Sequence, residues 1–371
     1  MESWSYEALG MRRVINAAAT LTRLGGSRMP PEVVQAMDAA AGSFVDLVEL
    51  QQRVGERIAE LTRNEACYIS SGAAAGMAIV VAACITGKDP KKVASLPFTD
   101  GPQPEVVVHR SQRNGYDHAA RMTGARLVEI GLAHTTQAWE LEAALSPHTA
   151  CVLYFAGAHF TATARPLAEV VEVAHARGVP VIVDAAAQIP PVANLWHFTR
   201  DLGADAAVFS GGKGLRGPQS AGLVVGRRDL VEACALNGPP NHSLGRPMKV
   251  GKEEMLGMLA AVDCALRQDE PALLAWYEET VQGWLQGLQG AAGISAERGY
   301  PSEAGQPHAR AIVHVANGKR DAVVSALWDR NPRIAVSAVG EDAIALNPQT
   351  LEPGEEVLVL QAVREVLAAQ A

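Results

Sequence analysis

The chain has 371 residues and 48% of them are hydrophobic, which is enough to bury the core of one large domain and a smaller second one. A formal net charge of −8, without any long cluster of Lys and Arg, argues against a surface for nucleic acid. The amino terminus carries no basic stretch followed by an apolar one, and no apolar run approaches about 18 residues, so we expect neither export nor membrane insertion.

Five cysteines are scattered over the chain, at positions 67, 84, 151, 234 and 264, and none forms a C-x-x-C pair. An odd number with this spacing predicts neither a disulfide framework nor a metal site. We therefore expect a protein of the reducing cytoplasm that binds no metal.

The first motif in chain order is a junction between a short apolar strand and a helix. Cys67–Ile69 leads through Ser70, Ser71 and Gly72 into a helix rich in alanine and valine, whose stretch Met77–Ile85 we expect to be buried. The first N–H groups of a helix lack intrahelical partners and the dipole there is positive, so such a junction suits a phosphate. Small residues at a helix start also serve close packing, and the motif alone does not decide between the two functions.

Strand and helix patterns alternate through the middle of the chain. This alternation predicts an α/β fold with a mainly parallel sheet, helices on both faces and functional residues at the strand ends. The expected strands are Cys67–Ile69, Val106–Val108, Leu127–Ile130, Cys151–Phe155, Val179–Val183, Ala206–Phe209 and Leu223–Val225.

A carboxylate ends one of these strands. Val179–Val183 is an apolar, β-branched run followed directly by Asp184 and then by alanines. An aspartate at the carboxyl end of a buried strand lies where open α/β sheets bind ligands, and it can keep a pyridine nitrogen protonated there. Asp184 can equally cap the helix that begins with the alanines.

A lysine follows the next strand, within a bend that is dense in glycine. Ser210–Gln219 has the sequence SGGKGLRGPQ and places Lys213 among four glycines, directly after the apolar strand Ala206–Phe209. A lysine in a dry pocket can lose its proton and bond covalently to a carbonyl, most familiarly that of pyridoxal 5'-phosphate (PLP). The alternative is a surface lysine on a turn, but Asp184 and the phosphate junction favour a cofactor site.

The pattern changes after about Asn237, where Gly-Pro-Pro breaks the chain. We expect a large domain over residues 46–237 and a small carboxy-terminal α/β domain over 238–371. The elements expected in the small domain are a long helical stretch from Glu253 towards Leu285 and short strands at Ala311–Val315 and Ala343–Leu346.

Together these segments resemble the phosphate loop, the pyridine-nitrogen aspartate and the covalent lysine of fold type I PLP enzymes. The resemblance narrows to the selenocysteine synthase-like family, and within it to the D-glucosaminate-6-phosphate ammonia-lyase branch. It extends over nearly the whole chain and is most specific around Lys213. The matching segments are Asn16–Gly26, Val183–Ala187, Ser210–Gln219 and Gly245–Glu254.

The resemblance implies the fold type I architecture and PLP as the cofactor. Lys213 is then the residue that binds the cofactor and moves the α-proton of the substrate, and Asp184 pairs with the pyridinium. Residues 1–45 are expected to pack on the small domain or at the active-site mouth. The phosphate is expected to lie on Ser71, Gly72, Ala73 and Ser210.

Further roles follow from the resemblance. We expect His109 to cover the open face of the ring, although Tyr116 and His118 follow the same strand. Gln188 comes four residues after Asp184, whereas several related enzymes place a Gln or His three residues after it, so its contact with the cofactor stays open. Residues expected to face the substrate or an anionic group are Thr20, Arg23, Arg246 and Lys249.

The lyase resemblance favours β-elimination from a hydroxy-amino acid or amino sugar acid, followed by loss of ammonia to give a 2-oxo acid. Racemisation and aldol cleavage start from the same acidified α-carbon and remain alternatives. The acidic charge opposes a selenocysteine synthase that grips tRNA, and the presence of both Lys213 and Asp184 opposes a non-catalytic homologue.

Fold type I sites are commonly completed across a subunit interface. We therefore expect a homodimer or a ring of dimers, with Gly245–Glu254 as a segment that one subunit contributes to its neighbour, and a small-molecule amino acid as the substrate.

Overall fold

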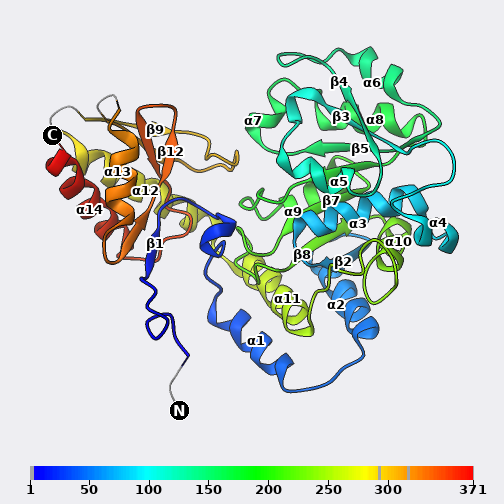
Figure 1. Cartoon of the computed structure of the whole chain (residues 1–371), viewed down its shortest axis with the longest axis horizontal. Helices are drawn as coiled ribbons and strands as arrows, with labels where there is room; N and C mark the ends of the chain where they lie inside the picture. The colour runs from blue at the N-terminus through cyan, green and yellow to red at the C-terminus, as the bar shows by residue number, and fades with distance from the viewer. Residues whose placement is uncertain (1–3, 291–293, 316–317, 371) are drawn as a thin grey trace. The chain divides into compact units, whose positions relative to one another are not determined.

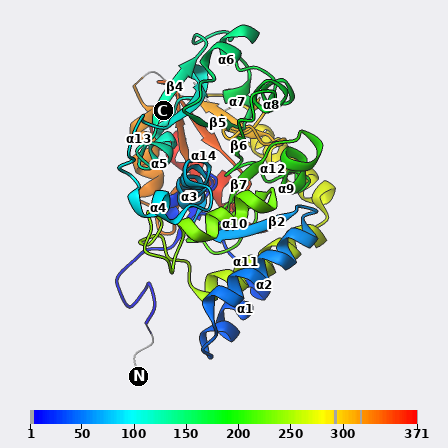
Figure 2. The same ribbon diagram turned by 90° about the vertical axis from the view of Figure 1, so that its right-hand side faces the viewer.

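The computed structural model describes residues 4–290, 294–315 and 318–370. The chain divides into two compact units, a larger one of Arg28–Gln268 and a smaller one formed by Met1–Ser27 with Asp269–Ala371. These bounds differ from those expected at residues 45/46 and 237/238, because helix α11 (Lys252–Arg267) packs against both α1 (Pro31–Ala41) and α2 (Leu47–Leu61). Figure 2 shows the three helices side by side.

A seven-stranded sheet forms the centre of the larger unit, with the strand order β2-β8-β7-β6-β5-β3-β4 (Figure 1). Neighbouring strands from β7 to β4 run parallel, whereas β8 lies antiparallel between β2 and β7. The predicted mainly parallel sheet is confirmed, and every expected strand is present. The bounds are β2 Ala66–Ser70, β3 Glu105–His109, β4 Arg126–Ile130, β5 Thr149–Phe155, β6 Val181–Asp184, β7 Ala206–Ser210 and β8 Gly222–Gly226.

Helices cover both faces of this sheet because successive strand residues point to opposite sides. In β5, Val152 and Tyr154 belong to the core that packs with α2, α8 (Leu167–His175) and α11. Cys151 and Leu153 belong to the core that packs with α3 (Ala73–Thr86) and α10 (Arg228–Asn237). The predicted buried helix around Met77–Ile85 is α3. Besides α1, α2 and α11, the helices of this unit are α3 Ala73–Thr86, α4 Pro90–Ser95, α5 His118–Arg121, α6 Ala138–Ala144, α7 Ala158–Thr161, α8 Leu167–His175, α9 Asn194–Trp196 and α10 Arg228–Asn237.

The smaller unit has an antiparallel sheet in the order β12-β13-β10-β9 and a parallel pair, β1 with β11. Its core includes Trp284, which is 1% exposed. Because β1 supplies one strand of the parallel pair, the amino-terminal segment is part of this unit. The bounds are β1 Val14–Asn16, α12 Glu270–Leu288, β9 Ser295–Gly299, β10 Arg310–His314, α13 Arg320–Trp328, β11 Arg333–Ala335, β12 Ser337–Val339, β13 Ala343–Leu346 and α14 Glu355–Gln370.

The helical stretch expected from Glu253 towards Leu285 is two helices rather than one, and the prediction was wrong at this point. α11 ends at Arg267, and the Asp269 side chain then accepts a hydrogen bond from the Ala272 N–H at 3.0 Å. Pro271 occupies the first turn of α12, where its missing N–H costs little. The Asp-Glu-Pro sequence is therefore a helix start signal that interrupts the apolar periodicity.

Within the described ranges, no helix is both long enough and apolar enough to cross a membrane.

Candidate active site

Asp184 is the last residue of β6, a strand that is buried along its whole length. Its Oδ1 accepts a hydrogen bond from the Ala186 N–H at 2.9 Å, and β6 pairs with β7 so that Asp184 lies opposite Val208. Burial raises the pKa of Asp184, while the Ala186 N–H and the charge of Lys213 act in the opposite direction. The short turn that follows the strand thus stabilises a carboxylate that is buried.

The loop that carries Lys213 is tightly packed, and its glycines are required by their neighbours. A Cβ at Gly211 would lie 2.6 Å from the Met258 sulfur, and one at Gly212 would lie 2.6 Å from the Gln219 Cα. A Cβ at Gly214 would clash with the Ile189 carbonyl oxygen. The loop between β7 and β8 therefore follows its path only because these positions lack side chains.

Lys213 is largely buried, and burial lowers the pKa of its ammonium group, while the charge of Asp184 acts in the opposite direction. Each of the two residues thus perturbs the other electrostatically, although 29 positions of chain separate their numbers. The Lys213 Nζ also lies 5.9 Å from the centroid of the Tyr116 ring, within reach of a cation–π contact. The structure therefore brings Asp184, Lys213 and Tyr116 together.

The residues Ser71, Gly72 and Ala73 form the junction between β2 and α3. Gly72 has φ of +104°, a conformation that favours glycine, and it precedes the first helical residue, Ala73. A Cβ at Gly222 on β8 would lie 2.7 Å from the Gly72 carbonyl carbon and 2.9 Å from the Ala73 nitrogen. The start of α3 therefore lies directly against the backbone of β8. In the sheet β8 lies between β2 and β7, and β7 is the strand that leads to Lys213.

Ser210 and Gln188 lie on the two loops that follow β7 and β6. Ser210 ends β7, and its N–H donates to the Ala186 carbonyl at 3.3 Å. Gln188 is 8% exposed, and its backbone carbonyl accepts a hydrogen bond from the Asn194 side chain at 2.6 Å. Both residues therefore lie at the same edge of the sheet as Asp184.

His109 ends β3 and is fully buried. Its Nε2 accepts a hydrogen bond from the Arg165 N–H at 3.3 Å, and its ring lies edge-on to Tyr154 with the centroids 5.8 Å apart. Burial lowers the pKa of His109 to about 4, and the nearby Arg165 charge adds to this effect. The imidazole is therefore neutral near pH 7 and packed within the protein.

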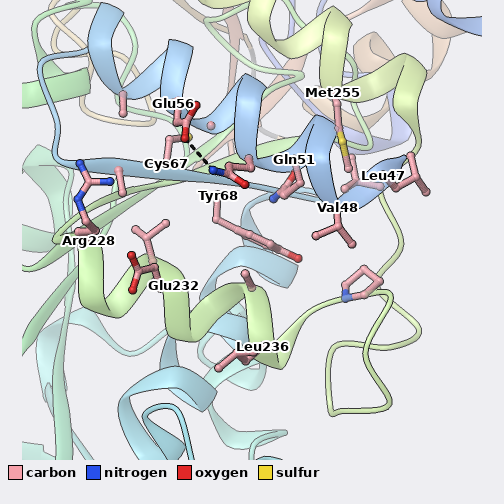
Figure 3. Close-up of a pocket in the computed structure, with 18 of the residues that line it drawn as sticks. Leu47, Val48, Gln51, Glu56, Cys67, Tyr68, Arg228, Glu232, Leu236 and Met255 are labelled. Atoms are coloured by element: carbon pink, nitrogen blue, oxygen red, sulfur yellow. Dashed lines mark hydrogen bonds between the residues drawn. The ribbon is translucent and has the colours of Figure 1, made fainter. Parts of the chain in front are cut away.

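Arg246 and Lys249 line a cavity of about 1020 Å³ within the larger unit. Figure 3 shows it between α2, which presents Gln51 and Glu56, and α10, which presents Arg228 and Glu232, with Tyr68 of β2 between the two helices. Neither Lys213 nor Asp184 is among the residues that line it. This cavity is therefore distinct from the surroundings of Lys213 and Asp184.

Thr20 and Arg23 belong to the smaller unit. The guanidinium of Arg23 lies 5.6 Å from the ring centroid of Trp328, as a cation–π pair. Thr20 follows Ala19, which has φ of +59°, and the Asn16 side chain bonds to the backbone of Ala18 and Ala19 at 2.9 and 2.8 Å. This segment is thus held in a tight, strained turn.

Tyr116 is the neighbour of Lys213 that the sequence did not single out. Tyr116, His109 and His118 all follow the strand Val106–Val108. The sequence does not show which of the three side chains lies near Lys213. The Asn-Gly pair before Tyr116 indicated a turn, but not the direction in which the tyrosine points.

Among the described residues, no cluster of His, Cys, Asp and Glu has the size to hold a metal ion.

Comparisons with known proteins agree on one family. The model of the aminotransferase class-V family matches residues 101–246. The chain is 33% identical to D-glucosaminate-6-phosphate ammonia lyase of Salmonella typhimurium, over 97% of each chain. A solved structure of D-glucosaminate-6-phosphate ammonia-lyase superposes with a TM-score of 0.84 and 31% identity, covering 100% of this chain and 99% of the other. A 5'-C-glycyluridine monooxygenase-decarboxylase of a Streptomyces species is 39% identical, over 69% of this chain and 64% of its own.

Proposed function

Because the chain belongs to the D-glucosaminate-6-phosphate ammonia-lyase family of fold type I, PLP-dependent lyases, we propose that it removes water and then ammonia from a hydroxylated amino acid, with Lys213 as the catalytic base. The observation that carries this proposal is the position of Asp184 and Lys213 at the carboxyl ends of the neighbouring strands β6 and β7, where their charges interact. The product is a 2-oxo acid.

The residues present fit the cofactor. Lys213 offers an amine whose lowered pKa favours bonding to a carbonyl, and Asp184 offers a buried carboxylate for the pyridine nitrogen. Ser71, Gly72 and Ala73 begin α3, whose first N–H groups suit the phosphate. The Ser210 hydroxyl is a further donor for the phosphate. PLP supplies the sink for the electrons released at the α-carbon.

Lys213 has two tasks in this proposal. It holds the cofactor until the substrate amine replaces it, and its freed amine then takes the α-proton of the substrate. The tightly packed glycine loop fixes the backbone that carries the lysine, which favours keeping its amine near the carbon from which it takes the proton.

For the open face of the ring, the geometry supports Tyr116 over His109. His109 is fully buried and its Nε2 is occupied by the Arg165 N–H, whereas the Tyr116 ring is beside Lys213. His109 would then act on the cofactor ring only indirectly, by holding Arg165 and the loop after β5. Gln188 stays a candidate for the phenolic oxygen of the cofactor.

The substrate is proposed to be an amino sugar acid, because the family's named member acts on a phosphorylated one. Thr20 and Arg23 are proposed to contact its carboxylate or its phosphate. Arg246 and Lys249 lie in a separate cavity of the larger unit and are proposed to serve the anion of a neighbouring subunit. The exposed Leu47 and Val48, which line that cavity, support a homodimer or a ring of dimers. A cytoplasmic location is proposed because the five cysteines are free.

The lyase assignment is tested with purified protein and added PLP. The wild type should turn yellow and release a 2-oxo acid and ammonia from D-glucosaminate 6-phosphate or a related hydroxy-amino acid, and Lys213→Ala should do neither. Lys88→Ala is the matched control, because Lys88 is an exposed lysine on a surface ion pair with Glu232. Full turnover by Lys213→Ala would refute the assignment, and a monomer in light scattering would refute the oligomer.

A second candidate is oxidative decarboxylation, which is favoured by the 39% identity to the monooxygenase-decarboxylase over most of this chain. Elimination and oxidative decarboxylation differ in their reactants and products, because only oxidative decarboxylation consumes O₂ and releases CO₂. An assay that follows O₂, CO₂ and ammonia together distinguishes them, and chiral analysis of recovered substrate in the same assay detects racemisation. Products of carbon–carbon cleavage without O₂ uptake would indicate an aldolase.

A further inference from the structure

Tyr116 lies beside Lys213 although little packing holds its side chain. Its residue is 63% exposed, and the Lys213 Nζ lies 5.9 Å from its ring centroid. An exposed side chain on a loop ordinarily samples several rotamers and gains little from any one of them. The position of the Tyr116 ring therefore depends on how firmly the backbone that carries it is held.

The residue that follows, Asp117, is a buried carboxylate with two cationic partners. It is 2% exposed; its Oδ2 accepts a hydrogen bond from the Arg113 Nε at 2.5 Å and its Oδ1 accepts one from the Arg121 Nε at 3.1 Å. Arg113 also pairs with Glu129 of β4, and its contact with Asp117 raises the pKa of its guanidinium. A carboxylate is buried at acceptable cost only when it is paired in this way.

The Asp117 side chain does not cap a helix, although aspartate at the start of a helix commonly does so. It precedes α5, but its carboxylate makes no capping hydrogen bond to the first turn of that helix. Its two carboxylate oxygens instead accept hydrogen bonds from Arg113 and Arg121, which lie before and after the short turn Gly115–Asp117. The arrangement fixes the turn, and with it the Tyr116 backbone.

The other end of the segment is anchored to the sheet. The Asn114 side chain accepts a hydrogen bond from the Tyr116 N–H at 2.8 Å and donates to the Gln112 carbonyl at 2.9 Å. The buried Gln112 amide in turn bonds to both the N–H and the carbonyl of Phe155, each at 3.1 Å. Phe155 ends β5 and pairs with Asp184 in the sheet, so Tyr116 is held relative to the strand end that carries the candidate site.

We propose that Asp117 is a positioning residue that, through Arg113 and Arg121, holds the Tyr116 ring over the group bound at Lys213. This inference rests on the proposed function, because it requires a cofactor at Lys213. It assigns no chemistry to Asp117 itself. The ring of Tyr116 makes the contact, and the buried carboxylate keeps it in place.

The test is a double-mutant cycle between Asp117→Asn and Tyr116→Ala in full-length protein, with PLP affinity and the circular dichroism of the bound cofactor as readouts. Asp117→Asn should weaken PLP binding about tenfold when Tyr116 is present and less than about twofold in the Tyr116→Ala background. It should also reduce the cofactor dichroism, because a mobile ring no longer imposes one asymmetric environment. Tyr116→Phe should retain both signals.

Asp263→Asn is the matched control, since Asp263 also pairs with an arginine four residues away but lies exposed on α11. Its PLP affinity should equal that of the wild type. If Asp117→Asn does not fold, Arg121→Gln enters the cycle in its place, because it removes one partner and leaves the carboxylate paired with Arg113.

Equal losses of affinity with and without Tyr116 would overturn the inference, since Asp117 would then act independently of the ring. If the wild type binds PLP but the effects of Asp117→Asn and Tyr116→Ala are independent, the inference is overturned and the proposed function stands. A wild-type protein that binds no PLP would overturn the proposed function, and the inference with it.

Discussion

Gly214 lies directly against the carbonyl oxygen of Ile189, with no room between them for a Cβ atom. Ile189 belongs to the loop that follows Asp184 and Gly214 to the loop that carries Lys213, so these two loops touch at this point. Because the contact is between backbone groups, neither loop can shift without moving the other. The distance between the candidate base and the candidate pyridine partner is thus set by packing as well as by the strand register.

Replacing Gly214 by alanine should therefore damage the site and the stability together. The added methyl group must displace the Ile189 loop, and overpacking of this kind costs about 1–3 kcal/mol. Chemical denaturation should show the loss, and PLP titration should show weaker binding. Gly283→Ala is the control, because a Cβ there meets nothing within 4 Å. In the interior of α12 this change should stabilise the protein by about 0.5–1 kcal/mol.

Lys213→Met should alter how the stability of the cofactor-free protein depends on pH. Burial lowers the pKa of Lys213 in the folded state below its ordinary value of 10.5, so between those two values the unfolded chain binds the proton that the folded chain has released. Wild-type stability then gains from this residue as pH rises through that window, by at most about 1.4 kcal/mol per pH unit. The variant should lack this gain, and denaturation curves from neutral to alkaline pH measure it. Identical slopes would contradict the buried position of the ammonium.

His109→Gln should reduce sensitivity to acid. Burial lowers the pKa of His109 to about 4 from an ordinary value of 6.5, so the unfolded chain binds an additional proton between those pH values. The wild type should lose stability as pH falls through this range, by up to about 1.4 kcal/mol per pH unit, and the variant should lose less. Thermal melts at a series of pH values check the result. His242→Gln, at an exposed position, should behave as the wild type does.

Asp184→Asn should separate cofactor binding from folding. The substitution keeps the shape of the side chain and removes a carboxylate whose pKa is raised by burial, so the cofactor-free protein should melt no earlier than the wild type. PLP should bind about tenfold to a hundredfold more weakly, because a charge-assisted hydrogen bond to the pyridinium is lost. Unchanged affinity would remove Asp184 from the cofactor site.

The sequence predicted most strands of the larger unit because they are short, continuous apolar runs, as in Ala206–Phe209, that are buried on both faces of the sheet. The edge strand β4 is an exception, because it carries charged residues and is only partly buried. An apolar run does not show whether its strand lies parallel or antiparallel to its neighbours. The sequence therefore did not predict that β8 is antiparallel to both β2 and β7. The chain divides after Gln268 rather than after residue 237 for a related reason. The apolar faces of α1 and α11 are complementary, but periodicity alone does not say which helices meet.

At the candidate site, the sequence could place Asp184 and Lys213 near one another because strand ends converge at one edge of a parallel sheet. Tyr116 could not be preferred over His109, because the choice depends on a turn held by Asp117 and Asn114 through long-range contacts. The separate location of Arg246 and Lys249 likewise depends on the packing of α2 and α10 around a cavity.

The crowded glycines around Lys213 have a consequence for protein engineering. A Cβ added at position 211, 212, 214 or 217 would lie closer to a neighbouring atom than ordinary contact allows, so randomising these positions should destabilise the protein. Tyr116 is exposed, and its ring has space on its outer side. Efforts to redirect substrate preference should therefore begin by varying position 116, while Asp117 and its two arginines are left as they are.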